Sequence, residues 1–458
     1  MGAFTEIDMQ LPEEFTQNMK QLLNEEQWSL FTKGMQENPP VSVRINPKKS
    51  TRIPDFMEEV ATLEPVPWST YGYYLDKRPN FTFDPLLHAG AYYVQEASSM
   101  FVEHVIKELI TKSVCMLDLC AAPGGKSIAS RSVLHEGSLL VSNEPIRTRA
   151  QVLMENIQKW GYPNCMVTSS YPADYSRSGV MFDVILCDVP CSGEGMFRKD
   201  PVAISEWNGQ KVEKCWHLQR EIVLDAWKCL LPGGILIYST CTFNTKENEE
   251  NIRFFIDELQ AIPVAIPTIP EWSITGSLLK GFEEPVYRFI PGISRGEGLF
   301  MCVLKKKGEP KTNDCRSLRK MIHENTHLLF CSDSISYKND GDNKLNKSSK
   351  RQNSKTKTKE KAVDNTPPNH AEALAETLEK GKYPQVELSY TDAMKYLRRD
   401  AITLPPDTPR GIIVVCFKQL PLGFVKNIGN RANNLYPQNW KIKSTHIPTE
   451  YETIFRPA

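Results

Sequence analysis

The chain has 458 residues, 40% of them hydrophobic, and its 55 Lys and Arg residues balance its 55 Asp and Glu residues. This length can bury a large core and predicts roughly three domains. The zero net charge excludes a uniformly basic or acidic surface. No apolar run reaches the ~18 residues that a membrane span needs.

The first predicted segment covers residues 1–92 and combines helical and extended patterns. Phe15, Met19 and Leu22 recur with the spacing of an amphipathic helix, and the stretch Val-Ser-Val-Arg-Ile-Asn-Pro follows at residues 41–47. We expect an α+β N-terminal module here. From residue 93 onward, strand patterns alternate with helical patterns as far as residue 306, which indicates a doubly wound α/β sheet.

The most informative loop of this core follows an apolar run at residues 113–119. It reads Cys120-Ala121-Ala122-Pro123-Gly124-Gly125-Lys126 and leads into a helical pattern. Gly124 and Gly125 allow positive φ and close backbone approach, and free amides at a helix N-terminus favour an anionic or carboxylate-bearing ligand. The spacing matches neither the dinucleotide fingerprint nor the Walker loop. The loop therefore predicts a crevice for a nucleotide-like cofactor.

The next predicted strand, near residues 138–143, ends at Glu144, about 20 residues after the glycines. An acidic side chain at this position can accept hydrogen bonds from both ribose hydroxyls of a nucleotide. The alternative is a solvated charge at the end of a strand. The glycine loop before it favours the ribose interpretation.

Two later strands deliver the reactive groups. The run 182–187 ends at Asp188 with Cys191 close behind, and the run 234–238 is followed by Cys241. Ligands of open parallel sheets collect at the carboxyl ends of the strands, so a carboxylate and two thiols are expected to meet one cofactor. A lone cysteine is more often a buried small hydrophobe, which is how we interpret the other ten.

Beyond the core the pattern weakens and then resumes. Residues 307–337 predict a small appended subdomain. Residues 338–370 are rich in Lys, Ser, Asn and Asp and predict a basic flexible linker, because they cannot bury a core. Residues 383–458 resume ordered patterning and predict a further small domain, in which Tyr436 and Trp440 are either stacking platforms for a ligand or buried aromatics.

Three segments together resemble one known family. Residues 117–126 read Leu-Asp-Leu-Cys-Ala-Ala-Pro-Gly-Gly-Lys, residues 188–195 read Asp-Val-Pro-Cys-Ser-Gly-Glu-Gly, and residues 238–242 read Tyr-Ser-Thr-Cys-Thr. This combination resembles the RNA 5-methylcytosine methyltransferases of the Sun/NSUN type. The segments 196–201 and 420–423 resemble their RsmF-like branch, which acts on small-subunit ribosomal RNA.

The resemblance implies a Rossmann-like class I methyltransferase core, an RNA-facing N-terminal module, a PUA-like C-terminal RNA-binding domain and S-adenosylmethionine as cofactor. It implies that Cys241 is the nucleophile that adds to carbon 6 of cytosine, and that Cys191 assists breakdown of the adduct. Asp188 would hold or protonate the cytosine edge, with Lys126 beside the base and cofactor. The cofactor set would be Glu144, Asp188 and the loop residues Cys120, Ala121, Ala122, Pro123, Gly124, Gly125 and Lys126.

Spacing alone leaves the roles of the two cysteines open, because DNA cytosine methyltransferases use a Pro-Cys nucleophile. The chain also departs from the family at two points. No acidic residue directly follows the third strand, where only Asp174 is nearby, and Gly292 stands where relatives commonly carry His.

The implied substrate is a cytosine of 16S ribosomal RNA, as naked RNA or in the small subunit. A transfer RNA enzyme and a catalytically silent assembly factor are the alternatives. We expect a cytoplasmic monomer without membrane or metal, because no Cys-x-x-Cys pair or His cluster has metal-ligand spacing and the N-terminus lacks a signal-peptide pattern.

RNA phosphates are negatively charged, so a chain of zero net charge that binds RNA must concentrate its positive charge locally. The candidate patches are Arg44, Lys48, Lys49 and Arg52; Arg198 and Lys199; and Lys418, Lys426, Arg431, Lys441 and Lys443. Any one of them can equally be a solvated face.

Overall fold

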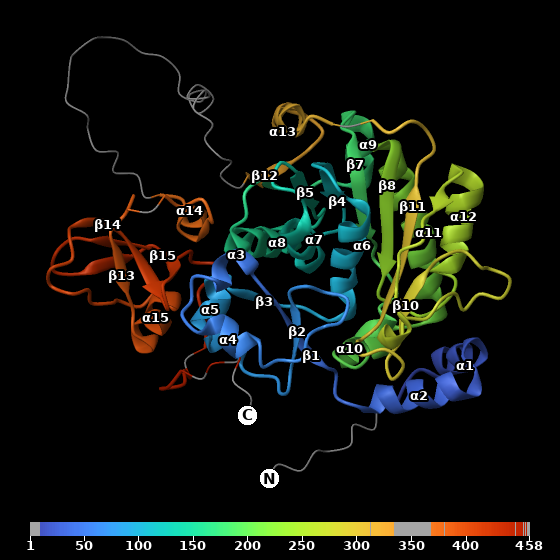
Figure 1. Ribbon diagram of the computed structural model, residues 1–458, viewed down its shortest axis with the longest axis horizontal. Helices are drawn as coiled ribbons and strands as arrows, with labels where there is room; N and C mark the ends of the chain where they lie inside the picture. The colour runs from blue at the N-terminus through green and yellow to red at the C-terminus, as the bar shows by residue number, and fades with distance from the viewer. Residues whose placement is uncertain are drawn as a thin grey trace.

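A computed structural model describes residues 10–311, 313–333, 368–379, 381–444, 446–451, 453 and 455. The predicted linker therefore lies outside the described residues, apart from 368–370. Figure 1 shows a large sheet on one side of the molecule and the C-terminal domain on the other, with most of the N-terminal elements below and between them.

The N-terminal module is built around a three-stranded antiparallel sheet in the order β2-β1-β3. Its helix α2 begins with a capping box between Asn24 and Gln27, which satisfies amides of the first turn. The elements are α1 (Glu13–Leu22), α2 (Glu25–Gln36), β1 (Val41–Ile45), α3 (Pro47–Ser50), α4 (Phe56–Val60), β2 (Gly72–Leu75), η1 (Phe81–Phe83), α5 (Pro85–His88) and β3 (Tyr92–Val94).

The large sheet has the order β10-β11-β8-β7-β4-β5-β6-β12, with β9 paired to β11. Its central strands run parallel, and the pairs at both edges are antiparallel. From β4 the chain adds β5 and β6 on one side, and it then returns to add β7 and β8 on the other side of β4. The crevice at the carboxyl end of β4 is therefore the topological switch point. The strands are β4 (Cys115–Asp118), β5 (Leu139–Asn143), β6 (Cys165–Thr168), β7 (Phe182–Asp188), β8 (Leu230–Thr240), β9 (Ile262–Pro263), β10 (Tyr287–Phe289), β11 (Leu299–Lys305) and β12 (Phe330–Asp333).

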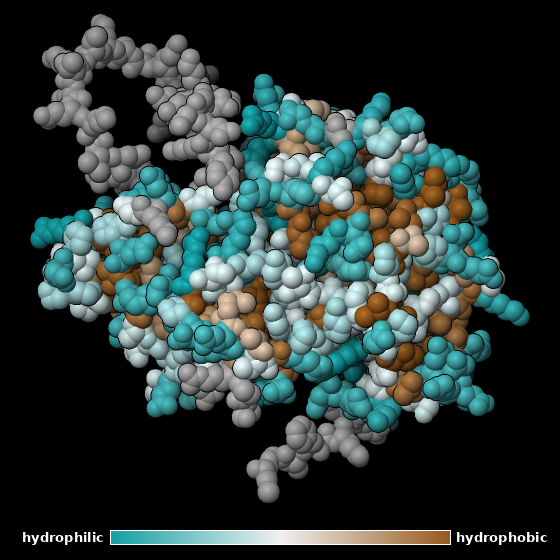
Figure 2. Space-filling model, viewed as in Figure 1, coloured by the Kyte–Doolittle hydropathy of each residue, from teal (hydrophilic) through white to brown (hydrophobic). Residues whose placement is uncertain are grey.

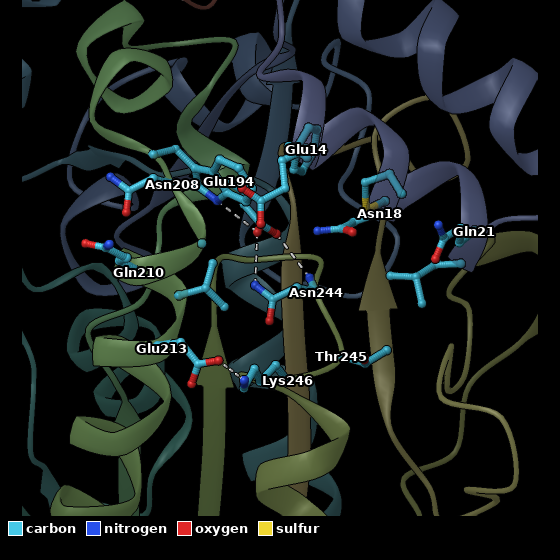
Figure 3. Close-up of a pocket in the computed structure, with 16 residues that line it drawn as sticks. Glu14, Asn18, Gln21, Glu194, Asn208, Gln210, Glu213, Asn244, Thr245 and Lys246 are labelled. Carbon is cyan, nitrogen blue, oxygen red and sulfur yellow. Dashed lines mark hydrogen bonds and ion pairs between the residues drawn. The ribbon is translucent and has the colours of Figure 1, made fainter.

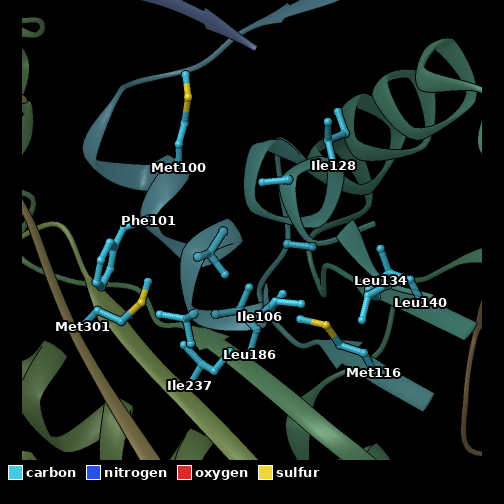
Figure 4. Packing of buried hydrophobic residues seen from close by; sticks show 14 of the residues in the cluster. Met100, Phe101, Ile106, Met116, Ile128, Leu134, Leu140, Leu186, Ile237 and Met301 are labelled. Carbon is cyan, nitrogen blue, oxygen red and sulfur yellow. The ribbon is translucent and has the colours of Figure 1, made fainter. Parts of the chain in front are cut away.

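Helices cover both faces of this sheet, because successive strand residues point to opposite sides. One apolar layer, which includes Phe101, Ile128 and Met116, packs α6, α7 and α8 on one face (Figure 4). A second layer packs α9, α11, α12 and α13 on the other. The helices are α6 (Phe101–Leu109), α7 (Gly125–Val133), α8 (Arg147–Trp160), α9 (Pro172–Ser178), α10 (Pro201–Glu206), α11 (Gly209–Lys228), α12 (Glu249–Leu259) and α13 (Cys315–Glu324), with short η2 (Ser98–Met100), η3 (Glu194–Met196) and η4 (Pro270–Trp272). The predicted doubly wound α/β core is confirmed.

Two strands differ in length from the strands that the sequence predicts. The apolar run near 263–267 forms only the two-residue strand β9. Pro263 and Pro267 carry no amide hydrogen, so this segment cannot donate a full ladder of hydrogen bonds. The strand expected at 234–238 begins earlier, at Leu230, and continues to Thr240.

Residues beyond 306 return to the edge of the large sheet. Strand β12 pairs antiparallel with β6, and Leu318 and Ile322 of α13 join the apolar layer that also holds α11. The segment predicted as an appended subdomain thus contributes a strand and a helix that contact the core directly.

The C-terminal domain is a four-stranded sheet in the order β13-β14-β15-β16. One apolar cluster joins its residues Met394 and Ile413 to Val43 and Phe56 of the N-terminal module. Tyr436 and Trp440 are buried, so they are core aromatics and not stacking platforms for RNA. The elements are α14 (His370–Leu374), β13 (Gln385–Glu387), α15 (Tyr390–Leu397), β14 (Gly411–Phe417), β15 (Leu420–Asn427) and β16 (Ala432–Asn434).

The face seen in Figure 2 is largely hydrophilic, with apolar residues gathered mainly on the half that holds the large sheet. Within the described ranges, no helix combines the length and the apolar character that crossing a membrane requires.

Candidate active site

The glycine loop leaves the carboxyl end of β4 and enters α7. Gly124 has φ +117°, which favours glycine, and an added Cβ would lie 3.2 Å from Leu153 Cδ1. The Ala121 amide donates to the carbonyl of Asn143 at 2.8 Å, which holds the loop against the end of β5. The loop thus lies at the switch point of the sheet, where ligands of such folds bind.

Asp118, the last residue of β4, supports this loop from below. Its Oδ2 accepts a hydrogen bond from Ser127 Oγ at 2.6 Å, whereas its buried Oδ1 has no partner among the described residues. Burial raises the pKa of Asp118 to about 7. A buried acceptor without a partner points to a donor that a ligand would supply.

Glu144 follows β5 and is almost completely buried. Its Oε1 accepts from the Ile146 amide at 3.0 Å, and its Oε2 lies 3.3 Å from Arg149 Nη1. These contacts fix the carboxylate beside the crevice, one strand away from the glycine loop.

Lys126 and Asp188 form an ion pair at the carboxyl end of β7, with Lys126 Nζ 2.9 Å from Asp188 Oδ2. Burial lowers the pKa of Lys126, but the Asp188 carboxylate outweighs burial and the pKa is raised. Ser239 of the neighbouring strand β8 donates to Asp188 Oδ1 at 2.7 Å. A fixed carboxylate with a charged lysine can orient a polar heterocycle.

The two predicted cysteines lie against each other, with Cys191 Sγ 3.0 Å from Cys241 Sγ. The Gly195 amide donates to the Cys241 carbonyl at 2.7 Å, and Ser192 Oγ lies 2.9 Å from Thr242 Oγ1, so the two loops are bound together. The contact with Cys241, followed by burial, raises the pKa of Cys191 well above its ordinary value. Cys191 therefore keeps its proton and can donate it toward the sulfur of Cys241.

The side-chain amide of Asn244 binds two buried carboxylates, and these contacts hold the two loops together. Asn244 Nδ2 donates to Glu194 Oε1 at 2.9 Å and to Glu247 Oε1 at 2.8 Å. Glu194 Oε2 also accepts from the backbone N–H of Asn244, and Glu247 Oε2 accepts from the backbone N–H of Ser192. Burial, followed by the charge of Glu194, raises the pKa of Glu247 to about 7. We call Glu194, Asn244 and Glu247 the carboxylate clamp.

Asn244→Ala should therefore destabilise the protein by about 3 kcal/mol at pH 8, because it leaves two buried carboxylates without their shared donor. The folded pKa of Glu247 is raised to about 7 from an ordinary 4.5, so the stability contributed by its neutral form is present below pH 4.5 and lost as pH rises through 7. The loss in Asn244→Ala should accordingly be smaller at pH 5 than at pH 8. Urea unfolding at both pH values measures it.

Thr245→Ala is the matched control, since its side chain has no hydrogen-bond partner in the described part of the chain. Equal losses in both variants, or a loss that ignores pH, would show that the clamp does not hold the loops.

The structure brings the predicted site residues together at one end of the sheet. The loop 120–126, Glu144, Asp188, Cys191 and Cys241 all follow or end the neighbouring strands β4, β5, β7 and β8. Cys120 lies beside them, and burial raises its pKa well above the ordinary value, which favours the thiol over the reactive thiolate. Sequence reasoning missed Asn244 and Glu247, for which no local signal exists.

Both departures from the family pattern have a structural account. Asp174 accepts from the Tyr171 amide and pairs with Arg177, so it caps α9. At Gly292 (φ +80°) an added Cβ would lie 1.9 Å from the Leu30 carbonyl oxygen, so close packing against α2 requires glycine.

Three of the predicted basic contacts are structural instead. Arg44 and Lys49 are buried, Arg44 in an ion pair with Glu103 and Lys49 against backbone carbonyls. Arg198 pairs with buried Glu297. A buried cation needs a charged or carbonyl partner. All three side chains join the N-terminal module to the core, since Arg198 also donates to the Gly34 carbonyl at 2.8 Å. Among the described residues, no group of His, Cys, Asp or Glu side chains is arranged to hold a metal ion.

Three family models match the chain in order. The N-terminal domain of 16S rRNA methyltransferase RsmF matches residues 11–97, the 16S rRNA methyltransferase RsmB/F matches 110–305, and the methyltransferase RsmF PUA domain matches 383–442.

Curated relatives agree with these models. A ribosomal RNA small subunit methyltransferase F from Pectobacterium atrosepticum is 32% identical over 325 residues, which cover 67% of this chain and 65% of that protein. The protein of the same name from Erwinia tasmaniensis is 26% identical over 468 residues, which cover 93% and 96%. The alignment with the first thus spans less than two thirds of its length.

Two solved structures from Pyrococcus horikoshii share the fold. A methyltransferase homolog protein has a TM-score of 0.55 at 24% identity, covering 64% of this chain and 95% of that chain. NSun6, solved with SFG, has a TM-score of 0.54 at 21% identity, covering 65% and 99%.

Proposed function

This chain belongs to the RsmB/F family of 16S ribosomal RNA methyltransferases, and we propose that it transfers a methyl group from S-adenosylmethionine to carbon 5 of a cytosine in 16S ribosomal RNA. The contact between the Cys191 and Cys241 thiols, beside the Lys126–Asp188 pair, is the observation that carries this proposal. In the same proposal the enzyme works as a monomer in the cytoplasm, on the RNA or the small subunit.

The cofactor crevice fits S-adenosylmethionine by the chemistry of its walls. The glycine loop admits close backbone approach, Glu144 can accept from the ribose hydroxyls, and the unpartnered Asp118 Oδ1 can accept from a ligand donor. When bound there, S-adenosylmethionine supplies an electrophilic methyl group. Residues 120–126, Glu144 and Asp188 are the residues proposed to hold it.

Carbon 5 of cytosine is a poor nucleophile, so the base must first be activated. Cys241 Sγ, as a thiolate, forms a bond to carbon 6, and the electron pair of the 5,6 double bond moves toward carbon 5. Asp188, held by Lys126 and Ser239, accepts from the polar edge of the ring and orients it. After methylation, carbon 5 releases its proton to solvent and the electron pair of that bond re-forms the 5,6 double bond. The sulfur then leaves carbon 6 with the electron pair of their bond. Cys191 assists that departure by donating its S–H toward the leaving sulfur.

Glu144→Ala should weaken S-adenosylmethionine binding roughly ten- to hundred-fold, because the loss of a charged hydrogen-bond acceptor costs about 1.5–3 kcal/mol. Isothermal titration measures the change. Glu155→Ala is the control, since this acid on α8 pairs with Lys159. Unchanged affinity in Glu144→Ala would place the ribose elsewhere.

The proposed activity is tested by incubating purified protein with labelled S-adenosylmethionine and RNA from a strain that lacks the gene. Nucleoside mass spectrometry should find labelled 5-methylcytosine in 16S ribosomal RNA. Label in transfer RNA alone would support the alternative substrate. No label in either RNA, together with no binding of S-adenosylmethionine, would favour a silent assembly factor.

A further inference from the structure

A cavity of about 940 Å³ opens beside the candidate active site, between α1, the start of α11 and the loop 244–246 (Figure 3). This volume is typical of a ligand pocket and is large enough for a nucleotide. It is separate from the cofactor crevice, because none of its lining residues belongs to the loop 120–126 or to the end of β5.

The cavity shares a wall with the loop that carries the nucleophile. Asn244 lines it, and its Nδ2 donates to Thr242 Oγ1 at 3.0 Å, next to Cys241. Three residues of chain span at most about 11 Å, so the cavity wall lies within that distance of Cys241. A strand whose cytosine sits at the thiols can therefore place a neighbouring nucleotide in this cavity.

The walls of the cavity are fixed in place by aromatic packing. Phe15 of α1 is buried and meets Trp207 edge-on with the ring centroids 5.7 Å apart, and it also packs against Phe197 and Phe243. The carboxylate of Glu14 lies against the first turn of α11, where an added Cβ at Gly209 would be 2.6 Å from Glu14 Oε1. Helix α1 is thus a built wall of the site.

The polar groups of the cavity suit a base and disfavour a phosphate. Glu14 and Glu213 carry negative charge, and Lys246 is already paired with Glu213. Phosphate would be repelled, whereas carboxylates accept hydrogen bonds from an exocyclic amino group.

Three amide side chains add further hydrogen-bonding groups to the walls of the cavity. Asn18, Gln21 and Gln210 line the cavity and have no hydrogen-bond partner among the residues that the structure describes. Each offers one acceptor and two donors, which is what reading the edge of an unstacked base requires. In Figure 3 the amide of Asn18 points toward the interior, on the side of Asn244.

Resting on the proposed function, we propose that this cavity receives the base of an unpaired nucleotide adjacent to the target cytosine, and prefers a base with an exocyclic amino group. Asn18 and Gln210 bind its edge from opposite walls, one on α1 and one on α11. The cavity would thereby contribute to the choice of target site.

The double variant Asn18→Ala/Gln210→Ala tests this inference. Both side chains are exposed and make no internal hydrogen bond in the described structure, so the fold should be kept, which circular dichroism checks. We expect the KM for RNA to rise about ten-fold, with kcat and S-adenosylmethionine affinity unchanged. Gln17→Ala, on the same helix but outside the cavity, should match the wild type.

A second measurement separates base recognition from a general effect on RNA affinity. Short RNAs that contain the methylated cytosine are made with an abasic nucleotide at each neighbouring position in turn. At one neighbouring position, removal of the base should lower the affinity of the wild type for RNA. Removal of the same base should not lower the already reduced affinity of the double variant any further. Additive losses at every position, or a wild-type KM in the double variant, would overturn the inference. Absence of methyl transfer by the wild type would instead refute the proposed function.

Discussion

Cys241→Ala is expected to abolish methyl transfer while leaving S-adenosylmethionine binding nearly intact. The substitution removes the sulfur proposed to add to carbon 6, and without this bond carbon 5 would not attack the methyl group. The residues proposed to hold the cofactor lie elsewhere, at the loop 120–126 and Glu144, so their geometry should persist. Methylation assays measure the loss of methyl transfer, and isothermal titration measures the binding of S-adenosylmethionine.

Cys302→Ala is a suitable control, because Cys302 is a buried cysteine of β11 that packs in the apolar layer holding α11. It should retain activity. Methyl transfer at the wild-type rate by Cys241→Ala would show that Cys241 is not the nucleophile. Loss of cofactor binding in this variant would show that the crevice depends on the loop after β8.

Cys191→Ala should trap the enzyme on its RNA. Once carbon 5 is methylated, the bond to Cys241 must break, and Cys191 is the group in contact with that sulfur, at 3.0 Å. Without this assistance the covalent complex should accumulate. On a denaturing gel with RNA and S-adenosylmethionine, Cys191→Ala should give a slowly migrating band that disappears with ribonuclease.

The double variant Cys191→Ala/Cys241→Ala should give no such band. Adduct formation by Cys191→Ala should also fall at low pH, because only a thiolate adds to the ring. An adduct that survives loss of Cys241 and vanishes on loss of Cys191 alone would exchange the roles of the two cysteines. Chemistry of that kind would resemble that of the DNA enzymes.

The sequence was sufficient to predict that three loops lie at one end of the sheet, because their signals are local. Each of the segments holding Gly124, Cys191 and Cys241 follows an apolar strand within a few residues, and parallel strands bring their carboxyl ends together. The alternation of strands and helices likewise predicted the doubly wound core.

Contacts between distant residues could not be predicted in the same way. Glu194 and Asn244 are 50 positions apart, and their pairing depends on how the loops after β7 and β8 meet. Arg44 was counted among possible RNA contacts because its charge is visible in the sequence and its partner Glu103, on α6, is not. Gly292 is a departure from the family pattern whose reason, close packing against Leu30, cannot be seen in the sequence.

The central claim, that this chain methylates a ribosomal cytosine through Cys241, is tested most directly by mapping 5-methylcytosine in 16S ribosomal RNA from a strain in which the gene is deleted. One methylated cytosine should be missing, and the wild-type gene should restore it whereas the Cys241→Ala gene should not. An unchanged methylation map in the deletion strain, or restoration by the Cys241→Ala gene, would contradict the account.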